Sequence, residues 1–183
     1  MLESKQNVFD DFAAAAEYLI REKVTAPERL AISGRSNGGL LVAAAITQYP
    51  QLFKAAVCGV PLTDMIRYHL LQIARLWIPE YGSTENPDQF PFLFAYSPYH
   101  HVKDGTAYPA TLIFSAESDT RVDPMHARKF AARLQAATSS QAPILLRIEG
   151  KAGHGAGKPM DKIIEQYTDE FSFLFEELGV FEP

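Results

Sequence analysis

The sequence predicts an α/β protein in which a mostly parallel sheet carries helices on both faces. Short runs that are apolar at nearly every position recur along the chain, and segments with helical periodicity alternate with them. A continuous apolar run indicates a strand that is buried on both faces, as in parallel sheets. The 183 residues are 47% hydrophobic and 21% charged, which fits one globular domain over 1–183.

The first half of the chain is expected to contain two helices and two strands. Residues 7–23 carry apolar side chains at helical spacing, and 29–33 form a short apolar run that a glycine ends. A helix of small apolar residues follows over 38–48, and a second strand follows over 55–60. A proline comes directly after this second strand and ends it.

The second half begins with an irregular, partly helical stretch over 63–96 and then resumes the alternation. Strands are expected over 110–116 and 144–148, and helices over 124–136 and 162–178. Right-handed crossovers should distribute the helices over the two faces according to strand order. Loops at the carboxyl ends of the strands carry the chemistry in such sheets, so candidate catalytic residues are expected in these loops.

Composition excludes several classes of protein. Lys and Arg number 17 against 22 Asp and Glu, and this net charge of -5 argues against nucleic-acid binding. Cys58 is the single cysteine, so no disulfide framework is possible, and we expect it to be a buried apolar residue. No apolar run reaches the roughly 18 to 20 residues of a membrane span. Residues 1–6 lack the pattern of a signal peptide, so we expect a cytoplasmic protein, with the periplasm as an alternative.

The loop after the first strand carries a candidate nucleophile. Gly34-Arg-Ser-Asn-Gly38 fits G-x-S-x-G between a strand and a helix, the context of a nucleophile elbow with Ser36 at its centre. Gly34 and Gly38 are expected to be required because a Cβ atom there would collide with a neighbouring element. The alternative is a glycine-rich helix start without any chemistry.

A serine nucleophile needs a histidine base and an orienting carboxylate. Asp119 follows the third strand and His154 follows the fourth, so the order serine, acid, histidine is that of an α/β-hydrolase. Glu117 and Asp123 are alternative acids in the same loop. No cluster has metal-ligand spacing and residues 153–158 lack the spacing of a phosphate loop, so we expect no metal and no cofactor.

The remaining histidines lack a glycine-flanked loop after a strand. We expect His126 to lie on a helix surface, and His100 and His101 to be a structural or solvated pair.

Several motifs in order give the chain a family resemblance. It resembles the C-terminal part of the catalytic domain of the prolyl oligopeptidase family, serine peptidases that combine an α/β-hydrolase domain with a β-propeller. The resemblance covers nearly the whole chain. Its motifs are Lys5-Gln-Asn-Val-Phe-Asp-Asp-Phe, Gly34-Arg-Ser-Asn-Gly-Gly-Leu-Leu-Val, Trp77-Ile-Pro-Glu-Tyr-Gly, Tyr96-Ser-Pro, Ser118-Asp-Thr-Arg-Val and Ala152-Gly-His-Gly-Ala-Gly-Lys-Pro.

The resemblance implies roles for individual residues, and its triad coincides with Ser36, Asp119 and His154. The backbone N–H of Asn37 resembles one half of the oxyanion hole, and Trp77 resembles the indole that stacks on the proline ring of the substrate. Further pocket residues implied by the resemblance are Tyr81, Leu62 and Val122 for the wall and Arg121 for a substrate carbonyl. From the residues alone, Trp77 could be a core residue and Arg121 could pair with Asp123 or Glu117.

Parts of the family's pattern lie upstream of residue 1. These are a tyrosine that donates the second oxyanion hydrogen bond, the first strands of the sheet, and the propeller. The chain is therefore expected to be a partial α/β-hydrolase domain whose first strands are missing and which contains no β-propeller. An exposed sheet edge would then invite self-association.

The main functional hypothesis is a serine endopeptidase that binds proline-containing peptides and cuts on the carboxyl side of proline. A second hypothesis is an esterase or an oligopeptidase that cuts after basic residues. We expect the pocket around Trp77 to lack an acidic residue, which argues against binding of a basic side chain. A third reading is a catalytically silent, self-associating module without a complete oxyanion hole.

Overall fold

A computed structural model of the chain describes residues 1–150, 153–154 and 159–180. In these residues one sheet of four parallel strands runs in the order β1-β2-β3-β4. Ile32, Ala56, Thr111 and Ile144 form one row across the sheet and define its register. The four predicted strands are confirmed as β1 (Ala31–Arg35), β2 (Ala55–Gly59), β3 (Ala110–Ala116) and β4 (Ile144–Glu149).

The strand β1 starts and ends two residues later than its apolar run predicts. Residues Pro27–Arg29 form a 3-10 turn, so the backbone is not yet extended there. At the other end, Gly34 pairs with Cys58 and Arg35 pairs with Gly59, so the ladder continues into the Ser36 motif. The strand therefore delivers Ser36 directly at the carboxyl edge of the sheet.

The helices occupy the segments between and around the strands. The irregular stretch between β2 and β3 contains 3-10 turns and three short helices, and six prolines interrupt the chain there. The helices are α1 (Gln6–Arg21), α2 (Asn37–Gln48), α3 (Ile78–Tyr81), α4 (Phe90–Tyr96), α5 (Pro98–His101), α6 (Met125–Ala137) and α7 (Met160–Glu177).

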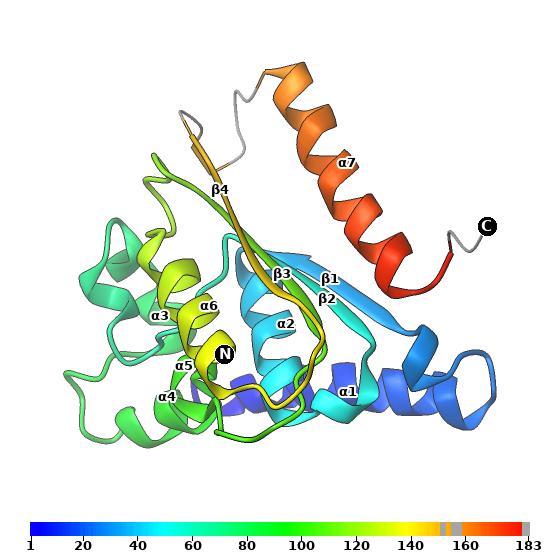
Figure 1. Cartoon of the computed structure of the whole chain (residues 1–183). Coiled ribbons are helices and arrows are strands. Elements are labelled where there is room, and N and C mark those ends of the chain that lie inside the picture. Colours follow the sequence, from blue (N-terminus) through cyan, green and yellow to red (C-terminus); the bar gives the residue numbers. More distant parts are fainter. Residues whose placement is uncertain (151–152, 155–158, 181–183) are drawn as a thin grey trace.

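Helices cover both faces of the sheet, but unequally (Figure 1). Strands that follow one another in order, joined by right-handed crossovers, keep their connecting helices on one side. Accordingly α2 and α6 share one core with Ile32, Cys58 and Ile113, and α1 packs into the same core. Among the described helices, α7 packs on the other face, through Phe173, against β2 and β3.

Burial differs between the central and the edge strands. All residues of β2 and β3 are buried, as their apolar runs predict. The expectation of burial on both faces is wrong for β1 and β4, where Leu145 is 46% exposed. Both are edge strands, each with a single neighbour in the described sheet.

Within the described residues, no helix combines the length and the apolar character that crossing a membrane requires.

Candidate active site

Ser36 stands at the turn from β1 into α2 with an unusual backbone. Its φ is 58° and its ψ is -116°, a conformation that non-glycine residues adopt at a cost of about 1 to 3 kcal/mol. Its N–H donates to the carbonyl of Gly59 at 2.9 Å, and its own carbonyl accepts the N–H of Leu40 at 3.0 Å. The neighbouring strand and the helix thus hold Ser36 in the strained turn expected of a nucleophile elbow.

The glycines around Ser36 differ in whether a Cβ atom would fit at their position. A Cβ atom on Gly34 would lie 2.3 Å from the carbonyl oxygen of Gly38, so Gly34 is required as predicted. The prediction for Gly38 is wrong, because a Cβ atom there meets nothing within 4 Å. The next residue carries that constraint instead: a Cβ atom on Gly39 would lie 2.5 Å from the carbonyl oxygen of Gly59. Close packing of α2 on β2 explains this.

Asp119 and His154 come together from the loops after β3 and β4. His154 Nδ1 lies 2.7 Å from Asp119 Oδ2, and the other carboxylate oxygen accepts the N–H groups of Arg121 at 2.8 Å and Val122 at 2.9 Å. The alternative acids lie elsewhere: Glu117 is exposed, and the Asp123 carboxylate receives the Gln72 amide at 3.3 Å.

The environment of Asp119 stabilises its ionised form. Burial by itself raises the pKa of this carboxyl group, but the hydrogen bonds from His154, Val122 and Arg121 outweigh it and leave the pKa below its ordinary value. Asp119 is 2% exposed. An ionised, buried carboxylate beside Nδ1 fixes the ring orientation of His154.

Ser36 is not hydrogen-bonded to His154 in the part of the chain that the structure describes. Catalytic hydrogen bonds are often long without substrate and tighten only in the complex. Several residues that flank His154, namely 151–152 and 155–158, lie outside the described residues. The Ala152 and Gly155 to Lys158 parts of the histidine motif fall there.

A cavity of about 150 Å³ opens beside Ser36, and it brings most of the nominated pocket residues together. Its lining consists of Ser36, Asn37, Leu62, Trp77, Glu80, Tyr81 and Arg121. Val122 is not part of the lining, but it is 2% exposed and packs in the same apolar cluster as Leu62 and Tyr81. It supports the wall from behind.

The side chains of Trp77 and Arg121 both line the cavity beside Ser36. Trp77 is only half-buried, lines the cavity and packs one side against the apolar cluster. Arg121 is exposed, and among the described residues it forms no ion pair with Asp123 or Glu117. Its guanidinium therefore remains available to a ligand in the cavity.

Sequence reasoning missed two charged residues at this site. The expectation of a pocket without an acidic residue is wrong, because Glu80 lines the cavity three residues after Trp77. Lys5 from the N-terminal 3-10 turn (Leu2–Lys5) reaches Glu80 with an Nζ–Oε1 distance of 3.0 Å. Glu80 was visible in the Trp77 motif, whereas nothing local marks Lys5 as its partner.

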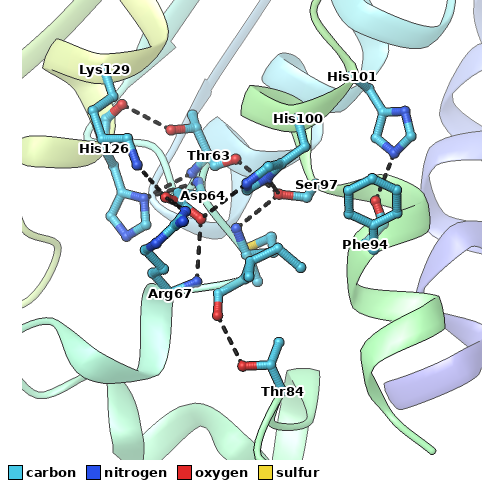
Figure 2. A network of polar contacts seen from close by, with 12 residues as sticks. Thr63, Asp64, Arg67, Thr84, Phe94, Ser97, His100, His101, His126 and Lys129 are labelled. Atoms are coloured by element: carbon cyan, nitrogen blue, oxygen red, sulfur yellow. Dashed lines mark hydrogen bonds and ion pairs between the residues drawn. The ribbon is translucent and has the colours of Figure 1, made fainter. Parts of the chain in front are cut away.

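A buried polar network supports the loop that follows β2, next to Leu62 (Figure 2). His126 of α6 accepts the N–H groups of Thr63 at 3.2 Å and Asp64 at 3.1 Å through Nδ1. The prediction that His126 lies on a helix surface is wrong: it is 2% exposed. Helical periodicity in residues 124–136 did not show that the loop covers this position.

The Asp64 carboxylate is the anion of this network. It receives the ammonium of Lys129 and the guanidinium of Arg67, the latter at 3.2 Å, and His100 lies 3.8 Å away. Burial raises its pKa, but the Lys129 ammonium outweighs burial and the pKa lies below the ordinary value. His101 bonds the carbonyl of Phe94 at 2.7 Å, so the prediction of a structural histidine pair fits.

Cys58 is fully buried on β2, as predicted. Its thiol lies 3.2 Å from the carbonyl oxygen of Gly39, and burial raises its pKa far above the ordinary value. It is a small packed side chain under α2 rather than a reactive thiol.

A parallel α/β sheet with a strained serine after the first described strand, and an Asp–His pair after the third and fourth, defines an α/β-hydrolase. The profile of the prolyl oligopeptidase family matches residues 1–180. The chain belongs to the prolyl oligopeptidase family, a family of serine peptidases.

Individual relatives agree with this assignment. The chain is 46% identical over 177 residues to a prolyl endopeptidase of Elizabethkingia meningoseptica, covering 96% of this chain and 25% of that protein. A solved prolyl endopeptidase structure is 59% identical with a TM-score of 0.95, covering 98% of this chain and 26% of that one. Prolyl oligopeptidase B of Galerina marginata, solved with a 35-mer hydrolysis and macrocyclization substrate, is 40% identical with a TM-score of 0.93, covering 97% of this chain and 25% of that one. The chain thus spans about a quarter of the length of these relatives.

Proposed function

We propose that this chain carries the catalytic centre of a serine peptidase that hydrolyses peptides on the carboxyl side of proline. One arrangement supports this proposal: the strained Ser36 lies beside an aromatic cavity, and the His154–Asp119 pair with its 2.7 Å contact stands at the same edge of the sheet. The relative from Elizabethkingia meningoseptica is named a prolyl endopeptidase, which agrees with a cavity lined by Trp77 and Tyr81.

The proposed reaction begins with attack of Ser36 Oγ on the carbonyl carbon that follows proline. His154 accepts the hydroxyl proton and returns it to the leaving amine, while Asp119 stabilises the imidazolium. The acyl-enzyme is then hydrolysed by water, which His154 activates in the same way.

The developing oxyanion would receive the backbone N–H of Asn37. Asn37 is the first residue of α2, and the first N–H groups of a helix have no acceptor within the helix. These N–H groups are therefore free to donate hydrogen bonds to an oxyanion that develops beside Ser36. The family resemblance implies a tyrosine hydroxyl as the second donor, and loss of one oxyanion donor typically lowers kcat by about 10² to 10³.

The cavity accounts for the proposed preference for proline. Trp77 offers a flat apolar face to the pyrrolidine ring, and Tyr81 and Leu62 close the wall. Aromatic contacts of this kind contribute about 0.5 to 1.5 kcal/mol beyond the burial of area. Arg121 would donate to a carbonyl of the substrate from the rim.

Covalent labelling tests the nucleophile. A fluorophosphonate probe is expected to label the chain, and Ser36→Ala is expected to abolish labelling because the proposed nucleophile is removed. Ser33→Ala is the matched control, an exposed serine on the preceding strand that should leave labelling intact. Equal labelling of the Ser36→Ala variant would exclude Ser36 as the nucleophile.

An acyl hydrolase of different specificity is the alternative enzyme. Glu80 on the cavity wall is the observation that favours it, since a carboxylate could bind a basic side chain. Comparing kcat/KM for proline-linked and arginine-linked chromogenic peptides in the protein that contains this chain decides between the two.

A self-associating module is the alternative from another class. It is favoured by the described strand β1, which has a neighbour on one side only. Sedimentation velocity of the chain tests this alternative.

A further inference from the structure

Lys5 places one ammonium group between the residue after the nucleophile and the wall of the cavity. Its Nζ lies 3.0 Å from Glu80 Oε1 and 3.2 Å from Asn37 Oδ1, and 5.1 Å from the ring centroid of Tyr81. Tyr81 also donates its hydroxyl to Asn37 Oδ1 at 3.0 Å. A residue from the first turn of the chain thus touches three residues that line the cavity.

Lys5 is buried, and the surrounding residues hold its ammonium group in a defined place. The residue is 3% exposed although it carries a long charged side chain. A buried charge is costly unless it is paired and hydrogen-bonded, and Lys5 has both a carboxylate and an amide oxygen as partners. Among the described residues, Lys5 is the only cation within ion-pair distance of Glu80.

Glu80 alone would give the cavity a negative wall. Its side chain is 36% exposed and lines the cavity together with Trp77 and Ser36. An unpaired carboxylate beside an aromatic surface attracts cationic side chains, and a mismatched charge is a common way in which a site excludes a competing ligand. With Lys5 at 3.0 Å, the charge of Glu80 is cancelled and this wall of the cavity offers no free carboxylate. The other charged residue of the lining is the cation Arg121, which adds to the exclusion of a cationic side chain.

We propose that Lys5 determines the specificity of this cavity by neutralising Glu80. The paired form accepts an uncharged proline ring, whereas a cationic side chain meets no free carboxylate and loses its own hydration. Lys5 is a positioning residue, since it acts through Glu80 and Asn37 rather than on the substrate. This inference rests on the proposed function of the cavity as the pocket for the residue before the scissile bond.

Binding of small probes to the 183-residue chain tests the proposal without requiring turnover. Acetyl-prolinamide and acetyl-argininamide are titrated separately, and the indole N–H resonance of Trp77, the only tryptophan, reports binding by NMR. In Lys5→Met, the ratio of the two dissociation constants should shift toward argininamide by about tenfold or more, because Glu80 is left unpaired. Lys5→Arg retains the charge and should retain the ratio of the parent chain.

The double variant separates charge from structure. Lys5→Met/Glu80→Gln has a neutral wall again and should return to the parent preference, which a merely structural role of Lys5 would not produce. Arg21→Met, which removes an exposed ion pair with Glu22, is the matched control and should change nothing. An unchanged ratio in Lys5→Met, or persistent argininamide binding in the double variant, would overturn the proposal.

Removal of the other member of the ion pair tests charge neutralisation if Lys5→Met does not fold. Glu80→Gln leaves the Lys5 ammonium without its carboxylate, so the cavity should gain affinity for the anionic probe acetyl-glutamate amide by about tenfold. No gain would refute charge neutralisation. Prolinamide binding is scored separately: if the parent chain does not bind it while Lys5→Met gains argininamide binding, the proposed proline specificity fails and the role of Lys5 stands.

Discussion

His126 shows how a single buried side chain holds the loop next to the cavity. Its Nδ1 accepts two backbone N–H groups from Thr63 and Asp64, so the ring must be neutral at that nitrogen. Burial is the main reason that the pKa of His126 is lowered to about 4. The carboxylates of Asp64 and Asp123 oppose this shift by raising the pKa, and the Lys129 ammonium lowers it further. The loop that carries Leu62 therefore depends on a histidine that stays uncharged.

Protonation of His126 predicts a pH-dependent stability. Because the folded pKa of about 4 lies below the unfolded value of 6.5, the unfolded state binds more protons between these pH values. The free energy of unfolding should therefore rise with pH across this window, by up to about 3 kcal/mol for this group, and fall again as the pH is lowered. Urea unfolding at a series of pH values measures it.

A variant isolates the histidine from the other titrating groups. His69 and His100 also have lowered pKa values, chiefly through burial, and add a slope of the same sign. His126→Asn keeps an acceptor near the position of Nδ1 and should flatten the profile, whereas His101→Asn should keep it. A parent-like slope in His126→Asn would show that another group titrates.

The turn from β1 into α2 is the element on which the site depends. The strand ladder extends to Arg35, and α2 begins at Asn37, so Ser36 has no room to adopt an ordinary conformation. Gly34 and Gly39 allow the close contacts of this turn, and Gly38 lies in open space.

Alanine substitutions in this element should have opposite effects. Gly34→Ala places a Cβ atom 2.3 Å from the Gly38 carbonyl oxygen, so it should destabilise the chain by several kcal/mol or prevent folding. Gly38→Ala should be neutral or stabilising by up to about 1 kcal/mol, because alanine favours the helix. Thermal and urea unfolding of both variants provide the comparison. Equal destabilisation by the two changes would contradict this account of the turn.

On the scale of the whole molecule, the open edge of β1 lies between two exposed apolar surfaces. One is a groove of about 290 Å³ between α1 and β1, lined by residues that include Phe12, Leu19 and Leu30. The other runs along α7, the helix that stands apart on the second face (Figure 1). Its exposed apolar side chains are Met160, Ile164, Tyr167, Phe171 and Phe175. Exposed edges with apolar flanks favour pairing with another chain.

The chain is therefore expected to self-associate at micromolar concentrations, as sedimentation velocity would show. Ser33→Lys places a charge on the exposed edge of β1 and should shift the chain toward the monomer. Leu146→Lys, at a 37% exposed position on the opposite edge strand β4, is the control and should not. A chain that is monomeric throughout the concentration range, or equal effects of the two variants, would refute association through β1.

The fold and the chain order of the site followed from local patterns. The apolar runs identified all four strands within two residues, and the G-x-S-x-G motif with its flanking strand and helix placed Ser36 at the turn. The helical periodicity of residues 7–23 and 162–178 likewise predicted α1 and α7. Such features depend on residues that are close in sequence, so the sequence contains them directly.

Other features depended on contacts between distant segments. Only the tertiary structure joined Asp119 rather than its neighbours to His154, buried His126 under the loop after β2, and placed Lys5 on Glu80 across 75 residues.

By itself, then, the sequence determined the strands, the helices and the order of the serine, the acid and the histidine, because periodicity and motif act over a few residues. The tertiary structure decided which glycine is crowded, which charges cancel and which edge is exposed. These depend on how strands and helices stack, and that geometry arises only when the whole sheet has formed.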